Sequence, residues 1–151
     1  MSAAEVDDFL GRERTCRVAT VGGDGSPHVA PLWFVWDGTA LWLNSIVRSQ
    51  RWVDLARNPQ VAVVVDGGHD FAELHGVEIR GRAVPVGDVP RGSGPDPELT
   101  QPEQQFARKY AGIDVFTPDG RHAWLRIVPD KLVSWDFRKN PALRPPAPTA
   151  D

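Results

Sequence analysis

The stretch CRVATVGGDGSPHVAPLWFVWDGTALWLNSIVRSQRWVDLARNPQVAVVV, from Cys16 to Val65, decides the fold that we expect for this chain. The turn at Gly22–Pro27 is rich in residues that tolerate positive φ, and Asp37-Gly38 is a second hairpin signal. Apolar and aromatic runs flank both turns. A short helix over 49–57 should end at Asn58-Pro59, because the residue before a proline avoids the helical region. The stretch therefore predicts hairpin-linked strands interrupted by one short helix.

The remaining sequence continues this pattern in both directions. It predicts further helices over 3–10 and 98–110, and strands over 17–21, 28–36, 40–44, 60–66, 71–86, 123–128 and 132–137. The β-branched run at 60–66 reads as a strand buried on both faces. We expect the 71–86 strand to break near Gly76 or Gly81, and the last two strands to join at Pro129-Asp130. Six to seven strands with short helices predict a mainly β fold, a closed antiparallel barrel.

The chain has 151 residues, which predicts one domain over 1–137 with a core of its own. The Gly87 to Gln101 segment is rich in proline, glycine and acids, and reads as a loop. The tail over 138–151 lacks the apolar residues needed to fold, so it is predicted to be disordered.

Composition narrows the classes of partner. Hydrophobic residues make up 41% and charged residues 25%, and the formal net charge of −3 gives no support to nucleic-acid binding. No apolar run approaches the length that spans a bilayer, and the acidic, amphipathic N-terminus does not resemble a secretory signal. The single cysteine, Cys16, suits a reducing compartment and reads as a packed thiol. We therefore expect a cytoplasmic protein without nucleic-acid or membrane partners.

Several common sites are absent from the sequence. No G-x-G-x-x-G follows a strand and opens a helix, and the glycines at 22–25 lack a Walker lysine and serine. The four histidines, His28, His69, His75 and His122, show no metal-ligand spacing, so we expect no metal site. No Ser-His-Asp arrangement is indicated.

A polar cluster follows the third predicted strand: Asn44, Ser45, Arg48, Ser49 and Arg51 arrive within a few positions. Hydroxyl groups, the free N–H groups of a helix start and guanidinium groups are the donors that bind phosphate. Alternatively, the arginines form the solvated face of the helix and pair with Asp54. Taken with the preceding hairpins, the cluster is better explained as a phosphate cradle.

The ordered series of motifs resembles the split β-barrel family of pyridoxamine-phosphate-oxidase-like flavoproteins, and within it the actinobacterial flavin/deazaflavin oxidoreductases. The likeness spans about Phe9 to Asp136. It is carried by Ala19-Thr20, Asp24-Gly25-Ser26-Pro27-His28, Pro31-Leu32-Trp33, Trp36-Asp37-Gly38, Asn44-Ser45, Arg51, Asn58-Pro59-Gln60-Val61-Ala62 and Gly81-Arg82-Ala83.

This resemblance implies a six- to seven-stranded antiparallel split β-barrel with a ring cofactor along Pro31, Leu32 and Trp33. It implies that the phosphate lies against the strand end and the following helix, which gives Asn44, Ser45, Arg48, Ser49, Gln50 and Arg51 as binding residues. It favours the deazaflavin coenzyme F-420, with FMN as the alternative, and hydride transfer to a small electron-poor substrate as the reaction. A non-catalytic flavin- or haem-binding module on the same barrel is a further alternative.

The resemblance also implies a homodimer with the cofactor held at the interface. Six tryptophans and long apolar strands exceed what a small barrel easily buries, which agrees with a dimer. Trp124, Trp135 and Phe71 are the expected contributions from the second protomer. The loop from Gly87 to Gln101 and the helix after it are expected to shape the substrate pocket.

Overall fold

The structure, a computed structural model, describes residues 1–143. The chain folds into three α-helices and six strands. The helices are α1 (Ala3–Arg12), α2 (Gln50–Arg57) and α3 (Thr100–Ala111). The strands are β1 (Thr15–Val21), β2 (Pro27–Trp36), β3 (Leu41–Ile46), β4 (Gln60–Gly67), β5 (His75–Val86) and β6 (His122–Asp136).

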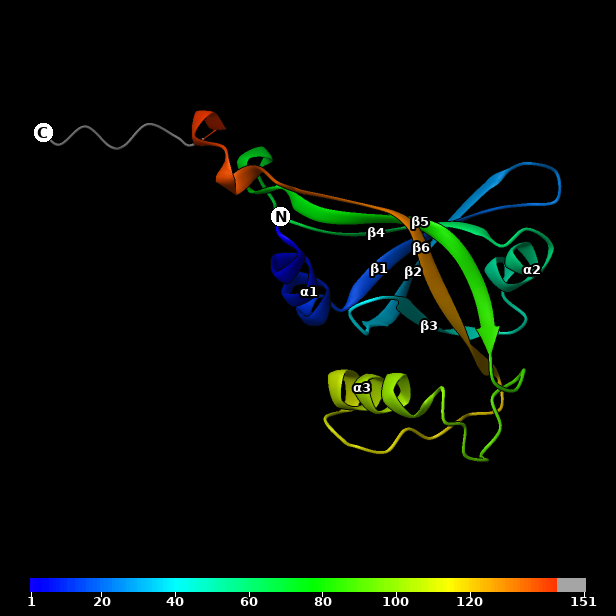
Figure 1. The fold of residues 1–151 in the computed structure, drawn as a ribbon. Coiled ribbons are helices and arrows are strands. Elements are labelled where there is room, and N and C mark those ends of the chain that lie inside the picture. The colour runs from blue at the N-terminus through cyan, green and yellow to red at the C-terminus, as the bar shows by residue number, and fades with distance from the viewer. Residues whose placement is uncertain (144–151) are drawn as a thin grey trace, which may run out of the picture.

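All strand pairs are antiparallel, and the sheet closes on itself in the order β1-β2-β3-β6-β5-β4. Figure 1 shows α1 and α2 at opposite ends of this barrel, with α3 lying below β3. Contacts join α1 and α3 to β2, and α2 to β1. The predicted mainly β barrel with short flanking helices is confirmed.

The ladder between β2 and β3 is short. Only Phe34–Trp36 of β2 pair with Leu41–Leu43 of β3. The earlier part of β2 pairs with β1 alone, while residues 44–46 of β3 pair with β6 alone. Beyond these pairs, with increasing distance from the Asp37-Gly38 turn, the two strands diverge and leave the barrel wall open.

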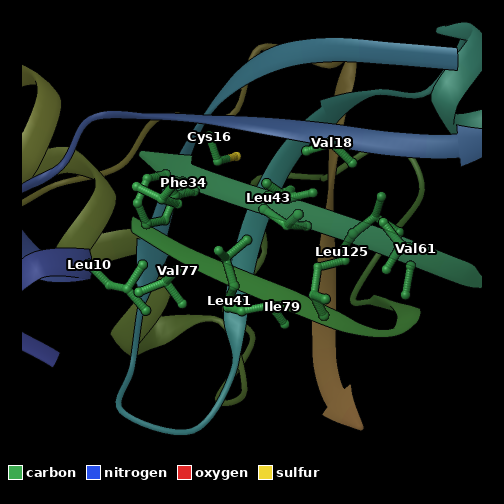
Figure 2. Packing of buried hydrophobic residues seen from close by; sticks show 14 of the residues in the cluster. Leu10, Cys16, Val18, Phe34, Leu41, Leu43, Val61, Val77, Ile79 and Leu125 are labelled. Carbon is green, nitrogen blue, oxygen red and sulfur yellow. The ribbon is translucent and has the colours of Figure 1, made fainter. Parts of the chain in front are cut away.

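The barrel interior is filled by inward-facing residues from every strand, and Figure 2 shows how tightly these side chains pack. Leu41, Leu43, Val63 and Ile79 are each at most 1% exposed. Cys16 lies in the same cluster, and burial raises the pKa of its thiol to about 12. The prediction of a packed thiol is confirmed.

The prediction of two closing strands joined at Pro129-Asp130 is wrong. β6 is one continuous strand, and it pairs with β5 from Trp124 to Asp136. Pro129 lies opposite Gly81, where the register shifts between Arg80 and Gly81. A proline has no N–H to donate, so it is tolerated at this irregularity without ending the strand. β5 therefore does not break near Gly81; the irregularity there is a bulge in which Asp130 of β6 is the extra, unpaired residue.

Three smaller differences concern the strands and the tail. β4 is not buried on both faces: Ala62 and Val64 are half-buried, because their side of the strand faces outward. Residues Phe71–Glu73 form a 3-10 turn that precedes β5. Two further 3-10 turns follow β6, over 137–139 and 141–143, while the predicted disorder of 144–151 lies outside the described residues.

Among the helices of residues 1–143, none has both the length and the apolar character that crossing a bilayer requires.

Two glycines provide a matched test of the bulge. A Cβ on Gly81 would clash with the main-chain oxygen of Val128, whereas a Cβ on Gly11, in α1, would meet nothing. We expect Gly81→Ala to lower the free energy of unfolding by more than about 2 kcal/mol, because backbone must shift. Gly11→Ala should raise it by about 0.5–1 kcal/mol. Urea denaturation measures both, and equal effects of the two variants would contradict the close approach at the bulge.

Candidate functional site

A cavity of about 480 Å³ lies where β2 and β3 diverge. Pro31, Leu32 and Trp33 of β2 form one wall, and Asn44 and Ile46 of β3 form another. The remaining lining residues come from α2, α3 and two long loops: Arg51, Arg91, Phe106, Phe116, Thr117, Pro118, Asp119 and His122. Because β2 pairs only with β1 in this region, its other edge offers unpaired main-chain donors and acceptors.

The alternation of β3 separates core from cavity. Leu43 and Ser45 are fully buried, whereas Asn44 and Ile46 lie on the opposite face of the strand and line the cavity. His122, the first residue of β6, pairs with Ile46. Residues directly opposite each other in a ladder share a face, so this pairing brings an imidazole to the cavity.

An aromatic layer from α3 covers the β2 wall. The ring of Tyr110 stacks on Trp33 with centroids 4.4 Å apart and planes 8° from parallel. The Tyr110 hydroxyl accepts a hydrogen bond from the Phe34 N–H (2.9 Å) and lies 2.7 Å from the carbonyl oxygens of Phe34 and Arg14. These contacts fix α3 over the point where the β1–β2 ladder ends.

Arg51 is a buried cation without an acidic partner. Its side chain is 7% exposed, and its Nε and Nη2 donate to the Ser45 hydroxyl at 3.3 and 3.1 Å. Within the described part of the chain, no carboxylate forms an ion pair with it. Burial lowers the pKa of Arg51, because removal from water disfavours the charged form. A guanidinium in this position is suited to bind an anion entering the cavity.

Asn44 presents a second unsatisfied donor. Its Nδ2 is buried and has no hydrogen-bond partner among residues 1–143. Buried polar groups rarely remain unpaired, because each lost hydrogen bond costs about 1–3 kcal/mol. An acceptor atom of a bound ligand would satisfy this amide.

The other predicted residues support the site from outside the cavity. Ser45 anchors Arg51, Ser49 caps α2 by accepting the Trp52 N–H, and Gln50 donates to Asp54. Arg48 is exposed and does not line the cavity. The structure thus brings five of the predicted residues to one cavity: Pro31, Leu32, Trp33, Asn44 and Arg51.

The alternative of a solvated arginine face paired with Asp54 does not hold for Arg51. Asp54 is buried and accepts hydrogen bonds from Gln50 and from the Thr20 hydroxyl, both at 2.8 Å. These bonds lower the pKa of the Asp54 carboxyl. Arg57 is exposed and donates to the main chain of Val21, as expected for a surface residue.

The sequence indicated that the Gly87–Gln101 loop contributes to the pocket, but not which of its residues does so. Arg91 lies in the loop after β5, is 5% exposed, and forms an ion pair with Glu103 of α3 at 2.7 Å. Glu103 also accepts a hydrogen bond from Trp124 Nε1. Trp124 is fully buried within its own protomer, so the prediction that it reaches a partner's site is wrong. The expectation that the Gly87–Gln101 loop shapes the pocket is met by Arg91.

Asp119 and His122 form a pair at the cavity edge. His122 Nδ1 lies 2.7 Å from Asp119 Oδ2, and Asp119 Oδ1 accepts the main-chain N–H groups of Arg121 and His122. The Arg121 N–H, and then the His122 ring, hold the pKa of Asp119 down to about 2. No residue spacing in the sequence indicated that Asp119 and His122 would form a pair. Residues 1–143 contain no cluster of three metal-ligating side chains.

Comparisons with known proteins agree with this architecture. The pyridoxamine 5'-phosphate oxidase family matches residues 2–136. A conserved hypothetical protein of Mycobacterium tuberculosis is similar in structure, with 32% identity and a TM-score of 0.77, covering 99% of this chain and 95% of its own. An F420 reductase shares 23% identity (TM-score 0.61; 84% of this chain, 94% of its own). HutZ, the heme storage protein of Vibrio cholerae, shares 17% (TM-score 0.66; 86% and 92%).

No curated protein matches the sequence. The family match extends from α1 to the end of β6, and therefore includes every strand of the barrel and all lining residues of the cavity. The chain belongs to the pyridoxamine 5'-phosphate oxidase-like family of split β-barrel proteins.

Proposed function

We propose that the protein is an oxidoreductase that binds the deazaflavin coenzyme F-420 in the cavity between β2 and β3. The observation that carries the proposal is the unpaired cation of Arg51 beside the unsatisfied Asn44 amide. Both groups offer donors to one cavity, as a phosphate-bearing cofactor requires. When bound, the reduced coenzyme supplies a hydride, which passes to a small electron-poor organic substrate.

The residues present fit such a group. A fused ring needs an apolar, flat-walled slot, and Pro31, Leu32 and Trp33 provide one with an open main-chain edge. A phosphate needs positive charge and hydrogen-bond donors, which the cavity-lining Arg51 and Asn44 supply. Phe106 and Tyr110 pack against Trp33 and extend the aromatic surface beside this slot.

The fold shared with an F420 reductase is the reason for placing the deazaflavin before FMN in this proposal. FMN remains the alternative cofactor, because the same ring slot and the same phosphate donors would serve FMN and F-420 alike. A haem-binding module is the candidate from another class, favoured by His122, which lines the cavity and has its Nδ1 held by Asp119. Its Nε2 would be the axial ligand in that case.

Titration of the purified protein with F-420, FMN and haem separates these candidates. Trp33 lines the cavity, so binding should quench tryptophan fluorescence. We expect micromolar or tighter binding of F-420, about tenfold or more tighter than that of FMN. Preference for FMN would move the chemistry to flavin reactions, and a Soret band with haem alone would favour the module. Absence of binding by all three would contradict a cofactor role for the cavity.

We further propose a homodimer in which the second copy closes the open side of the cavity. Exposed apolar residues extend from the rim, where Trp33 and Ile46 are 51% and 43% exposed, to Val29 on β2, at 66%. A continuous apolar surface of this kind is typical of an interface. Trp135 and Phe71 remain predicted partner contributions, and both lie near the far end of β5 and β6 in their own protomer.

Val29→Asp should therefore produce a monomer that retains its fold and binds cofactor at least about tenfold more weakly, because a charge is placed in the interface. The control is Val133→Asp on β6, which is 38% exposed and does not line the cavity. Light scattering at micromolar concentration measures the mass. A monomeric wild type would contradict the dimer, and a dimeric Val29→Asp would contradict this interface.

A further inference from the structure

We propose that His122 is the proton donor that completes the reduction of substrate, with Asp119 as its positioning residue. This inference rests on the proposed function, since a proton is needed only if the cavity carries out a hydride reduction. It assigns a catalytic role to a pair of residues outside the cofactor-binding set.

The Asp119 carboxylate determines which ring nitrogen of neutral His122 carries the proton. Main-chain donors and the imidazole hold the pKa of Asp119 at about 2, so its carboxyl group is charged at neutral pH. A charged carboxylate only accepts hydrogen bonds, so the contact of 2.7 Å to Nδ1 requires an Nδ1–H donor. Gly120, with φ of 71°, allows the turn that brings the two side chains together. Nε2 is then the nitrogen left for a ligand.

The place of His122 in the sheet makes this nitrogen available. Its side chain lines the cavity and is 26% exposed, so it is sheltered but reachable. His122 is the first residue of β6 and lies directly opposite Ile46 of β3. Asn44, which carries the unsatisfied amide, is two residues before Ile46 on the same face of β3. The His122 carbonyl accepts the main-chain N–H of Arg91 at 2.8 Å, which fixes the backbone at this point.

His122 is also the one side chain of the described cavity lining that can both donate and accept a proton through ring nitrogens. Arg51 and Arg91 retain their protons, and Asp119 remains ionised. Glu103 neutralises Arg91, and Arg121 lies 3.6 Å from Asp119 with a side chain 75% exposed. Tyr110 is not a lining residue, and its hydroxyl is engaged by main-chain groups.

The proton balances the reaction. The bound coenzyme would supply a hydride to one carbon of an electron-poor C=C bond, and the π electron pair would move to the conjugated neighbour. In the same step the imidazolium Nε2–H would transfer its proton to that electron pair, and the N–H bond electrons would remain on Nε2. The substrate gains two hydrogens in total, the coenzyme is oxidised by two electrons, and neutral His122 recovers a proton from solvent.

The test compares His122→Gln and Asp119→Asn with wild type and with His69→Gln, an exposed histidine outside the cavity. General acid catalysis contributes about 10²–10⁴-fold, so His122→Gln should slow single-turnover oxidation of the bound reduced coenzyme at least about 100-fold. Coenzyme affinity should change less than about threefold, because a proton donor contributes little to ground-state binding. The wild-type rate should fall at alkaline pH, and the variant should lose that dependence.

A second readout needs neither coenzyme nor turnover. Long-range ¹⁵N–¹H spectra of the labelled apo-protein, assigned with His122→Gln, report which ring nitrogen of neutral His122 carries the proton. We expect Nδ1–H in wild type and a shift toward Nε2–H in Asp119→Asn. Nε2–H in wild type, or full rate with an unchanged pH profile in His122→Gln, would overturn the inference. Loss of coenzyme binding by wild type would instead overturn the proposed function.

Discussion

The rest of the structure depends on the short hydrogen-bonded ladder between β2 and β3. Three register pairs beside the Asp37-Gly38 turn hold the strands together, and each strand then continues with a different neighbour. The barrel remains closed through this short ladder, yet its wall opens beyond it. The opening exposes an unpaired edge of β2 and one face of β3 in the same place. The cavity, its aromatic cover and its polar groups are all arranged around this divergence.

The energetic consequence is concentrated at Arg51. A buried guanidinium bound only to the Ser45 hydroxyl is unfavourable in a folded protein, because burial removes water without supplying a counter-charge. Asn44 adds a buried amide without an acceptor. Both features reduce stability unless a ligand offers an anionic acceptor. Functional sites commonly retain such unfavourable groups, because ligand binding uses them.

Local signals carried much of the fold. The turn at Gly22–Pro27, the Asp37-Gly38 hairpin and the stop at Asn58-Pro59 are encoded by adjacent residues, and each lies where predicted. The prediction at Pro129-Asp130 failed because a proline and an aspartate indicate a turn, unless their pairing as a bulge against Gly81 of the partner strand is known. That information is non-local.

The same distinction divides the site. Pro31–Trp33 and Arg51 lie within one short stretch of sequence, and the family resemblance that this stretch carries implied that they meet at one site. Arg91 and His122 reach the cavity through long connections, and their contacts with Glu103 and Asp119 arise only in the folded chain. The burial of Arg51 likewise depends on how α2 approaches Ser45, which helix periodicity alone does not fix.

The central claim is that Arg51 holds the phosphate of a cofactor. A thermodynamic cycle that combines one substitution with one change in the ligand tests this claim most directly. Affinities of wild type and Arg51→Met are measured for the phosphate-bearing cofactor and for the same chromophore without phosphate, with exposed Arg48→Met as control. We predict that Arg51→Met weakens the phosphate-bearing ligand by at least about tenfold, or 1.4 kcal/mol, and leaves the phosphate-free ligand and the control nearly unchanged. Equal weakening of both ligands, or of neither, would contradict the account.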